Sequence, residues 1–208
     1  MFCRHETTSS MFTWVLAVLA QNPDFQARLR AELREHIAPE ALRDPNADLA
    51  TTLESLPYLN AICAETSRLF PTVPMTRRIA IRDTQIMGLP VRKGTHFRMP
   101  IWWLNRSPAL WGPDATQFRP ERWIDADTGR PNNHGGAESN FALLTFLHGA
   151  RSCIGQGFAK AELRCLLAAW VLSFDFSIAN PAEVLIPEGV VTIKPKNGLN
   201  LRVKLAAA

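Results

Sequence analysis

Apolar residues recur at helical spacing in the first part of the chain. Four of them stand four positions apart and share one face of an expected helix: Phe25, Leu29, Leu33 and Ile37. Asn22-Pro23-Asp24 places a capping residue, a proline and an acid just before this stripe, which is typical of a helix N-terminus. We therefore expect a helix to start there, with Arg28 and Glu32 as a polar pair on its surface.

Two further helical segments flank this one. The apolar run from Phe12 to Leu19 indicates the middle of a helix, because no start signal precedes it. A second pattern predicts a helix from about Leu56 to Phe70, ended by Pro71 and Pro74. Between the helices, the stretch 39–52 is rich in Pro, Asn and Asp without periodicity, so we expect a loop there.

Alternation of apolar and polar residues follows the second of these helices. It predicts strands at 78–82, 85–87 and 95–99. Turn residues at Gly88-Leu89-Pro90 and Lys93-Gly94 separate these runs. We expect a small antiparallel sheet in this region.

The last hundred residues mix turns with one long helical run. Asn105-Arg106-Ser107-Pro108 predicts a capped helix that continues through Trp111. The stretch 125–140 is rich in Asp, Asn and Gly, which is typical of a mobile surface loop. Near the end, Asn197-Gly198 stands between two alternating runs and predicts a hairpin. The pattern as a whole indicates a mainly α fold with small sheets, of the α+β class.

Composition narrows the possible functions. The chain has 208 residues and 47% hydrophobic content, enough to bury a sizeable core. Its net charge of +4 is spread without a lysine or arginine block, which argues against a nucleic-acid partner. No run approaches the roughly 20 apolar residues that a membrane crossing requires. The four cysteines show no C-x-x-C spacing, which argues against zinc and a disulfide framework and favours an intracellular location: Cys3, Cys63, Cys153 and Cys165.

The segment 146–155 carries the strongest chemical signal. Gly149 and Gly155 bracket Cys153, and a helix-forming run, 156–173, follows the thiol. Backbone N–H groups at a helix N-terminus stabilise an anion, so a cysteine placed there can be held as a thiolate. Arg151 can pair with a carboxylate. Taken alone, however, a cysteine before a helix is far more often an ordinary buried residue than a ligand.

The spacing Phe-x-x-Gly-x-Arg-x-Cys-x-Gly in this segment resembles the haem-ligand loop of the cytochrome P-450 family, the haem-thiolate monooxygenases. The resemblance implies that Cys153 is the metal ligand, bound axially to the iron of haem b, and that Arg151 pairs with a haem propionate. It also assigns Phe146, Gly149 and Gly155 to the cofactor-binding set. A thiolate ligand favours cleavage of the O–O bond.

A second resemblance lies near the start of the chain. His5-Glu6-Thr7-Thr8 is similar to the oxygen-activating turn of the family's long central helix. The resemblance implies that Glu6 and Thr7 are catalytic, because a carboxylate and a hydroxyl can hold water and deliver protons. The chain departs from the family at Cys3 and Arg4, where small residues are usual. A polar patch on an exposed helix turn is the alternative.

A third pair of motifs concerns folding. Glu65 and Arg68 stand three residues apart on one helix face, where they would ordinarily form a weak surface ion pair. In the family, Glu-x-x-Arg joins an arginine from a later Pro-Glu-Arg-Phe/Trp segment, which matches 120–123 here. The resemblance therefore implies a buried structural triad of Glu65, Arg68 and Arg122. It also matches Arg78 to a second propionate contact, although a solvated strand charge is equally compatible with the spacing.

The resemblance covers nearly all of residues 1–208, which would form the C-terminal half of a cytochrome P-450 domain with part of the distal helix. It implies insertion of one oxygen atom from O2 into a small apolar organic substrate, with electrons from an NADPH-dependent reductase. Association with the endoplasmic reticulum surface would depend on an N-terminal anchor outside this chain. One alternative is an inactive truncated fragment or incomplete gene model. A haem-thiolate isomerase or dehydratase is another, although Glu6 and Thr7 argue against it.

Overall fold

The computed structural model describes residues 2–38, 40–41, 44 and 46–206, with the side chains of 2–5 excepted. Four helices come first: α1 (Phe2–Gln21), α2 (Pro23–His36), α3 (Leu49–Ser55) and α4 (Pro57–Leu69). After a strand-rich arm come α5 (Ile101–Leu104), α6 (Pro108–Trp111) and three 3-10 turns: η1 (Pro120–Trp123), η2 (Asn140–Ala142) and η3 (Gly149–Arg151). The long helix α7 (Gln156–Ser173) follows them.

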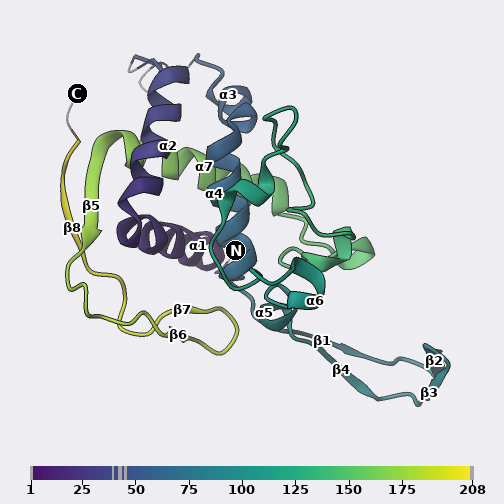
Figure 1. The fold of residues 1–208 in the computed structure, drawn as a ribbon. Helices are drawn as coiled ribbons and strands as arrows, with labels where there is room; N and C mark the ends of the chain where they lie inside the picture. Colours follow the sequence, from purple (N-terminus) through teal and green to yellow (C-terminus); the bar gives the residue numbers. More distant parts are fainter. Residues whose placement is uncertain (1, 39, 42–43, 45, 207–208) are drawn as a thin grey trace.

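The main hydrophobic core lies between α1, α2, α4 and α7 (Figure 1). Each of these helices contributes side chains with no exposed surface: Val15, Leu19, Leu29, Leu33, Leu59, Ile62, Leu167 and Val171. The stripe predicted for α2 is confirmed, because Leu29, Leu33 and Ile37 are buried and Phe25 packs against the same core. No helix in the described part of the chain is long and apolar enough to cross a membrane.

The polar contacts predicted for α2 are wrong in detail. Asn22 does not cap α2 with its side chain; its Nδ2 instead donates to the carbonyl oxygen of Val18 at the end of α1, at 2.8 Å. Arg28 does not pair with Glu32, because its guanidinium donates to Glu121 at 2.6 Å. Glu32 turns the other way and accepts from two backbone N–H groups at the start of α4, those of Tyr58 (2.7 Å) and Leu59 (2.8 Å).

The predicted loop 39–52 extends too far along the chain. Helix α3 begins at Leu49, inside that stretch, and its N-cap Asp48 accepts a hydrogen bond from the backbone N–H of Thr51 at 3.1 Å. Leu53 fixes the helix to the core, since it is buried against the neighbouring helices. A single capping aspartate and one buried leucine thus outweigh the loop-like composition.

Two short antiparallel ladders form an arm that projects from the helices (Figure 1). Strand β1 (Thr76–Ile79) pairs with β4 (His96–Met99), and at the tip β2 (Thr84–Ile86) pairs with β3 (Leu89–Val91). The predicted antiparallel pairing is confirmed, but the predicted turn at Gly88-Leu89-Pro90 is too long, because Leu89 and Pro90 belong to β3 and pair with Ile86 and Gln85. However, the first strand ends at Ile79, earlier than the predicted 78–82 run.

The hairpin predicted around Asn197-Gly198 is wrong. Gly198 does lie in a turn, with φ +77°, but the strands beside it pair elsewhere. Strand β8 (Leu201–Leu205) pairs with β5 (Phe174–Ile178), while β7 (Lys194–Pro195) pairs with β6 (Pro187–Glu188). The sheet pairs β8 with β5 because Phe176 and Ile178 are buried in the helical core, which favours that ladder over a local hairpin.

Candidate functional site

The loop before α7 folds back on itself to present a thiol. The backbone N–H of Cys153 donates to the carbonyl oxygen of Phe146 at 2.8 Å, and that of Ser152 donates to Gly149 at 3.0 Å. The turn requires positive φ at Gly149 (+69°) and at Leu147 (+59°). A glycine accepts this conformation without steric cost, which explains its place in the motif. The Cys153 side chain is left exposed.

Helix α7 begins directly after the thiol. Gly155 is its N-cap residue, and the N–H of Gln156 donates to the carbonyl oxygen of Cys153 at 3.2 Å. A Cβ at Gly155 would lie 3.9 Å from the Cys153 sulfur, so the helix start runs close beside it. The positive end of the helix dipole therefore lies near the sulfur.

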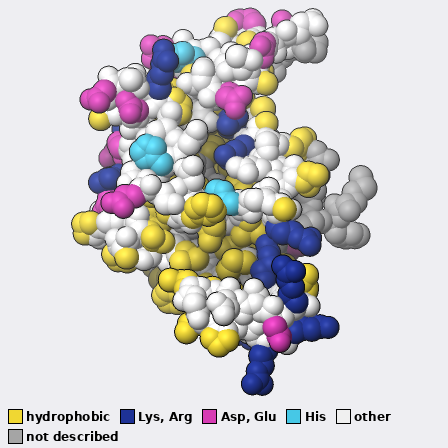
Figure 2. Space-filling model, turned by 90° about the vertical axis from the view of Figure 1, so that its right-hand side faces the viewer, with side chains coloured by type: hydrophobic (Ala, Val, Ile, Leu, Met, Phe, Trp, Pro, Cys, Tyr) yellow, Lys and Arg dark blue, Asp and Glu magenta, His cyan; other side chains and the backbone are white. Residues whose placement is uncertain are grey.

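A cavity of about 1110 Å³ lies against this loop. Its walls include Phe146, Arg151 and Cys153 from the loop and Thr7 and Thr8 from α1. Figure 2 shows hydrophobic side chains gathered in a hollow on the side of the molecule from which the β1–β4 arm projects. An exposed sulfur on one wall, hydroxyls on another and a largely apolar lining fit a flat cofactor held by a soft ligand.

The two expected catalytic residues lie on different sides of α1. Thr7 lines the cavity with Cys153. Glu6 is exposed beside a separate hollow, where its Oε1 accepts a hydrogen bond from the Thr192 hydroxyl at 2.9 Å. The departure from the family at Cys3 and Arg4 concerns side chains outside the described residues. The structure thus brings Thr7, rather than Glu6, to the cavity.

Arg78 lies in β1 beside the cavity wall. Its Nη1 donates to the Thr76 hydroxyl at 3.2 Å and to the carbonyl oxygen of Arg77 at 2.8 Å. Thr76 is part of the cavity lining. The guanidinium therefore contacts a residue of the cavity wall without itself lining the cavity, and its contact with a propionate stays a prediction.

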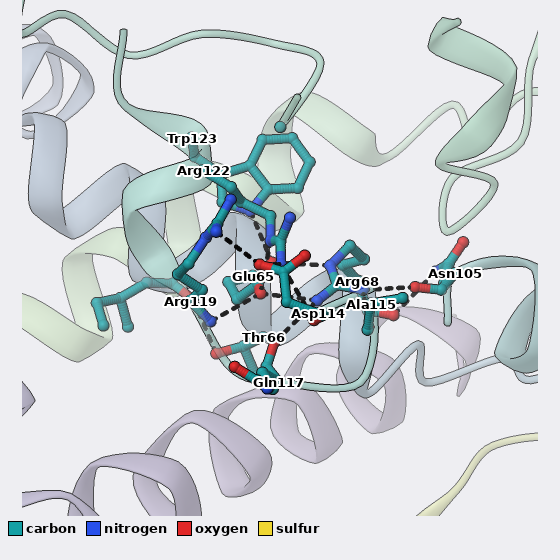
Figure 3. A network of polar contacts seen from close by, with 12 residues as sticks. Glu65, Thr66, Arg68, Asn105, Asp114, Ala115, Gln117, Arg119, Arg122 and Trp123 are labelled. Atoms are coloured by element: carbon teal, nitrogen blue, oxygen red, sulfur yellow. Dashed lines mark hydrogen bonds and ion pairs between the residues drawn. The ribbon is translucent and has the colours of Figure 1, made fainter. Parts of the chain in front are cut away.

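The predicted triad is confirmed as a buried network (Figure 3). The two Glu65 oxygens accept from Arg68 at 2.7 and 2.8 Å, and Oε1 also accepts from Arg122 Nε at 3.0 Å. Two further groups donate hydrogen bonds to the carboxylate: the Trp123 indole N–H at 2.9 Å and the backbone N–H of Arg119 at 2.9 Å. Glu65 and Arg68 have no exposed surface.

Arg68 uses every N–H of its guanidinium. Besides Glu65, its Nη1 donates to the carbonyl oxygens of Asn105 (2.7 Å) and Ala115 (2.6 Å), and its Nη2 donates to that of Gln117 (3.2 Å). These acceptors lie in the segment between α5 and η1. A fully satisfied buried charge of this kind anchors the loops to α4.

Sequence reasoning missed several members of this network. Trp123 follows directly after Pro120-Glu121-Arg122, so its place in that motif was the available signal. Asp114, which accepts from Arg122 Nη2 at 3.1 Å, carried no local signal. Asn105 was predicted only as part of a helix cap, whereas its side chain bonds Arg68 and Thr145. Their roles depend on contacts with residues distant in sequence.

Burial distinguishes the thiols around the cavity. Cys63 of α4 also lines it, but burial raises the pKa of that thiol to about 12, so it stays protonated at neutral pH. Lys160 lines the same cavity, with its ammonium 5.8 Å from the centre of the Phe146 ring, and burial lowers the pKa of Lys160. Cys153 therefore combines cavity access with solvent exposure, which a metal-binding thiol requires.

A loop thiol before a long helix, facing a cavity walled by a second helix, is an arrangement in which sulfur could bind a metal. The Cytochrome P450 family model matches residues 1–201, and the chain belongs to this family. Haem-thiolate ligation and oxygen insertion are general properties of the family.

Three curated fungal proteins illustrate the similarity. The chain is 50% identical over 200 residues to the cytochrome P450 monooxygenase ptmK of Penicillium ochrochloron, covering 96% of this chain and 39% of that protein. It is 50% identical over 196 residues to sphH of Aspergillus fumigatus (94% and 35% covered) and 42% identical over 206 residues to abl5 of Leptosphaeria maculans (95% and 37%). The chain thus spans less than two fifths of these relatives.

Proposed function

We propose that this chain provides the haem-ligand loop and part of the opposite wall of a haem-thiolate monooxygenase. The reaction inserts one oxygen atom from O2 into an apolar organic substrate and reduces the other to water, with electrons from NADPH through a reductase. The observation that carries the proposal is the exposed Cys153 thiol, which lines a cavity of about 1110 Å³ at the start of α7.

Haem b, when bound, supplies the iron at which dioxygen is activated. We assign Cys153 as its protein ligand and Arg151 as the partner of a propionate, because both line the cavity. Phe146 shapes the loop through its carbonyl oxygen, which accepts from the Cys153 N–H. Arg78 is assigned to a second propionate, since Thr76, its hydrogen-bond partner, belongs to the cavity wall.

The α1 wall is suited to proton delivery. Thr7 is at the cavity, so we assign its hydroxyl the inner step, which is to hold a water molecule and pass a proton across the wall. Glu6 is exposed on the other side, and we assign it the outer step of exchanging protons with solvent. The apolar remainder of the lining supports an apolar substrate: Met11, Val73, Ile101 and Leu143.

The test is the optical spectrum of the haem-loaded protein, reduced under carbon monoxide. Thiolate ligation gives a strongly red-shifted Soret band, and Cys153→Ser should abolish it. The matched control is Cys165→Ser, which removes the exposed thiol of α7 and should leave the band unchanged. A histidine-type spectrum in the unsubstituted protein would overturn the assignment.

A further inference from the structure

A buried asparagine connects the Glu65 network to the loop that carries Cys153. Asn105 follows α5 and has no exposed surface. Its backbone oxygen accepts from Arg68 at 2.7 Å, and its Nδ2 donates to the backbone oxygen of Arg68 at 3.0 Å. The same Nδ2 donates to the Thr145 hydroxyl at 2.9 Å, and Oδ1 accepts from the Leu144 N–H at 3.3 Å. One amide thus bonds both to α4 and to the segment that precedes the loop.

Thr145 completes the connection from the other side. Its hydroxyl accepts from Asn105 and donates to the backbone oxygen of Ser67 in α4 at 2.8 Å. The next residue is Phe146, whose carbonyl oxygen accepts from the Cys153 N–H at 2.8 Å. Two consecutive α4 residues are therefore linked to the ligand loop through a single hydroxyl group.

We propose that Asn105 and Thr145 are positioning residues that fix the Cys153 loop relative to α4. This inference rests on the proposed role of Cys153 as the haem-iron ligand. The loop itself is largely exposed from Gly149 to Ile154, so its own packing does little to set the position of the sulfur. The Glu65–Arg68 network is buried and fully bonded, which makes α4 a rigid reference. Hydrogen bonds beyond the ligand commonly orient it in this manner.

The chain offers a matched set of substitutions. Thr145→Val keeps the shape of the side chain but removes the hydroxyl, which leaves Asn105 Nδ2 and the Ser67 oxygen without this partner. Thr145→Ser restores the hydroxyl. The control is Thr66→Val, because the buried Thr66 hydroxyl donates to the Ile62 oxygen at 2.8 Å within α4 and does not contact the loop.

The first measurement is amide hydrogen exchange of the purified haem-free chain, which does not depend on the cofactor. We expect Thr145→Val to raise exchange of the segment 144–153 about tenfold, because both hydrogen bonds of the Thr145 hydroxyl are lost. Thr145→Ser should return the segment to its original rate. Thr66→Val should change the exchange rate of α4. The ratio of the loop exchange rate to the α4 exchange rate should be lower in Thr66→Val than in Thr145→Val.

The second measurement is the rate at which the thiolate-type Soret band of the reduced carbon monoxide complex is lost with time. It should be about tenfold faster in Thr145→Val and normal in Thr145→Ser. An exchange pattern in which Thr145→Val equals Thr66→Val, or in which Thr145→Ser fails to rescue, overturns the positioning role. If the unsubstituted protein shows no thiolate band, the proposed function fails instead, and the local exchange result still decides whether the link holds the loop.

Discussion

Two polar regions flank α4 and differ in how their polar groups are satisfied. The network at Glu65 is buried and closed: its carboxylate accepts from two guanidinium groups, one indole and one backbone N–H. The loop at Cys153 is open, because the side chains of Arg151 and Cys153 are exposed at the edge of the cavity. A closed network stabilises the fold, whereas an exposed thiol and an exposed guanidinium at a cavity are accessible to a ligand.

Substitutions in the two regions should differ in whether they act on folding or on binding. Substitutions in the network should lower the free energy of unfolding whether or not haem is present. Substitutions in the loop should cost less in the haem-free protein and act mainly on ligation. The link through Asn105 and Thr145 is where the two regions meet.

The largest effect is expected for Glu65→Ala. Removing the carboxylate leaves the guanidinium of Arg68 buried without its anion and leaves Arg122 with Asp114 alone, which should lower the free energy of unfolding by roughly 3–5 kcal/mol. Denaturant titration measures this. The matched control is Glu54→Ala, because Glu54 is 73% exposed in its 3.5 Å ion pair with Arg164 and should cost less than about 1 kcal/mol. Equal costs for the two variants would show that the network is not the folding element described.

An intermediate effect is expected for Cys63, the buried thiol of α4. Burial raises the pKa of Cys63 from 9.0 to about 12, so the unfolded chain releases this proton at a lower pH than the folded protein. The resulting stability is fully present below about pH 9 and is lost as the pH rises toward 12. The free energy of unfolding should therefore fall by up to about 1.4 kcal/mol per pH unit in that window.

The measurement compares denaturant unfolding between about pH 9.5 and 10.5 in three proteins. Cys63→Ala should lose this component of the pH slope. Cys165→Ala, which removes an exposed thiol, should keep it. A slope that is identical in Cys63→Ala and the unsubstituted protein would mean that Cys63 ionises as easily in the folded state as in the unfolded one.

The smallest effect is expected for Gly149→Ala in the haem-free protein. No atom lies within 4 Å of the added Cβ, so the cost comes from the backbone alone, which has φ +69° there. We expect a loss of roughly 1 kcal/mol. Gly157→Ala is the control: it has equal space, but it lies inside α7 and should gain roughly 0.5–1 kcal/mol. Thermal unfolding of both variants measures whether each substitution lowers or raises stability. A gain in stability for Gly149→Ala would contradict the positive φ of Gly149 in the turn.

Local signals predicted those parts of the fold that are decided by neighbours in sequence. Proline at the first position placed the start of α2, and the glycines around Cys153 placed the turn before α7. Contacts decided at long range were missed. Glu32 bonds the start of α4 instead of Arg28, since those backbone N–H groups have no partner within their own helix.

The candidate site shows the same division. The triad of Glu65, Arg68 and Arg122 followed from two short motifs, and the structure brings them together. Asn105 was not predicted, because an asparagine after a helix is ordinarily a turn residue and only the folded chain brings it between Arg68 and Thr145. Glu6 and Thr7 were predicted as a pair, yet neighbouring residues on a helix point in different directions, and only Thr7 of the two lines the cavity with Cys153.

The role of Cys153 as the haem-iron ligand is tested most directly by the set of atoms bound to iron in the haem-loaded protein. X-ray absorption at the iron edge distinguishes a sulfur neighbour from nitrogen and oxygen neighbours. We expect one iron–sulfur contact that is lost in Cys153→Ser and retained in Cys165→Ser. A spectrum of the unsubstituted protein that contains only nitrogen and oxygen neighbours would contradict it.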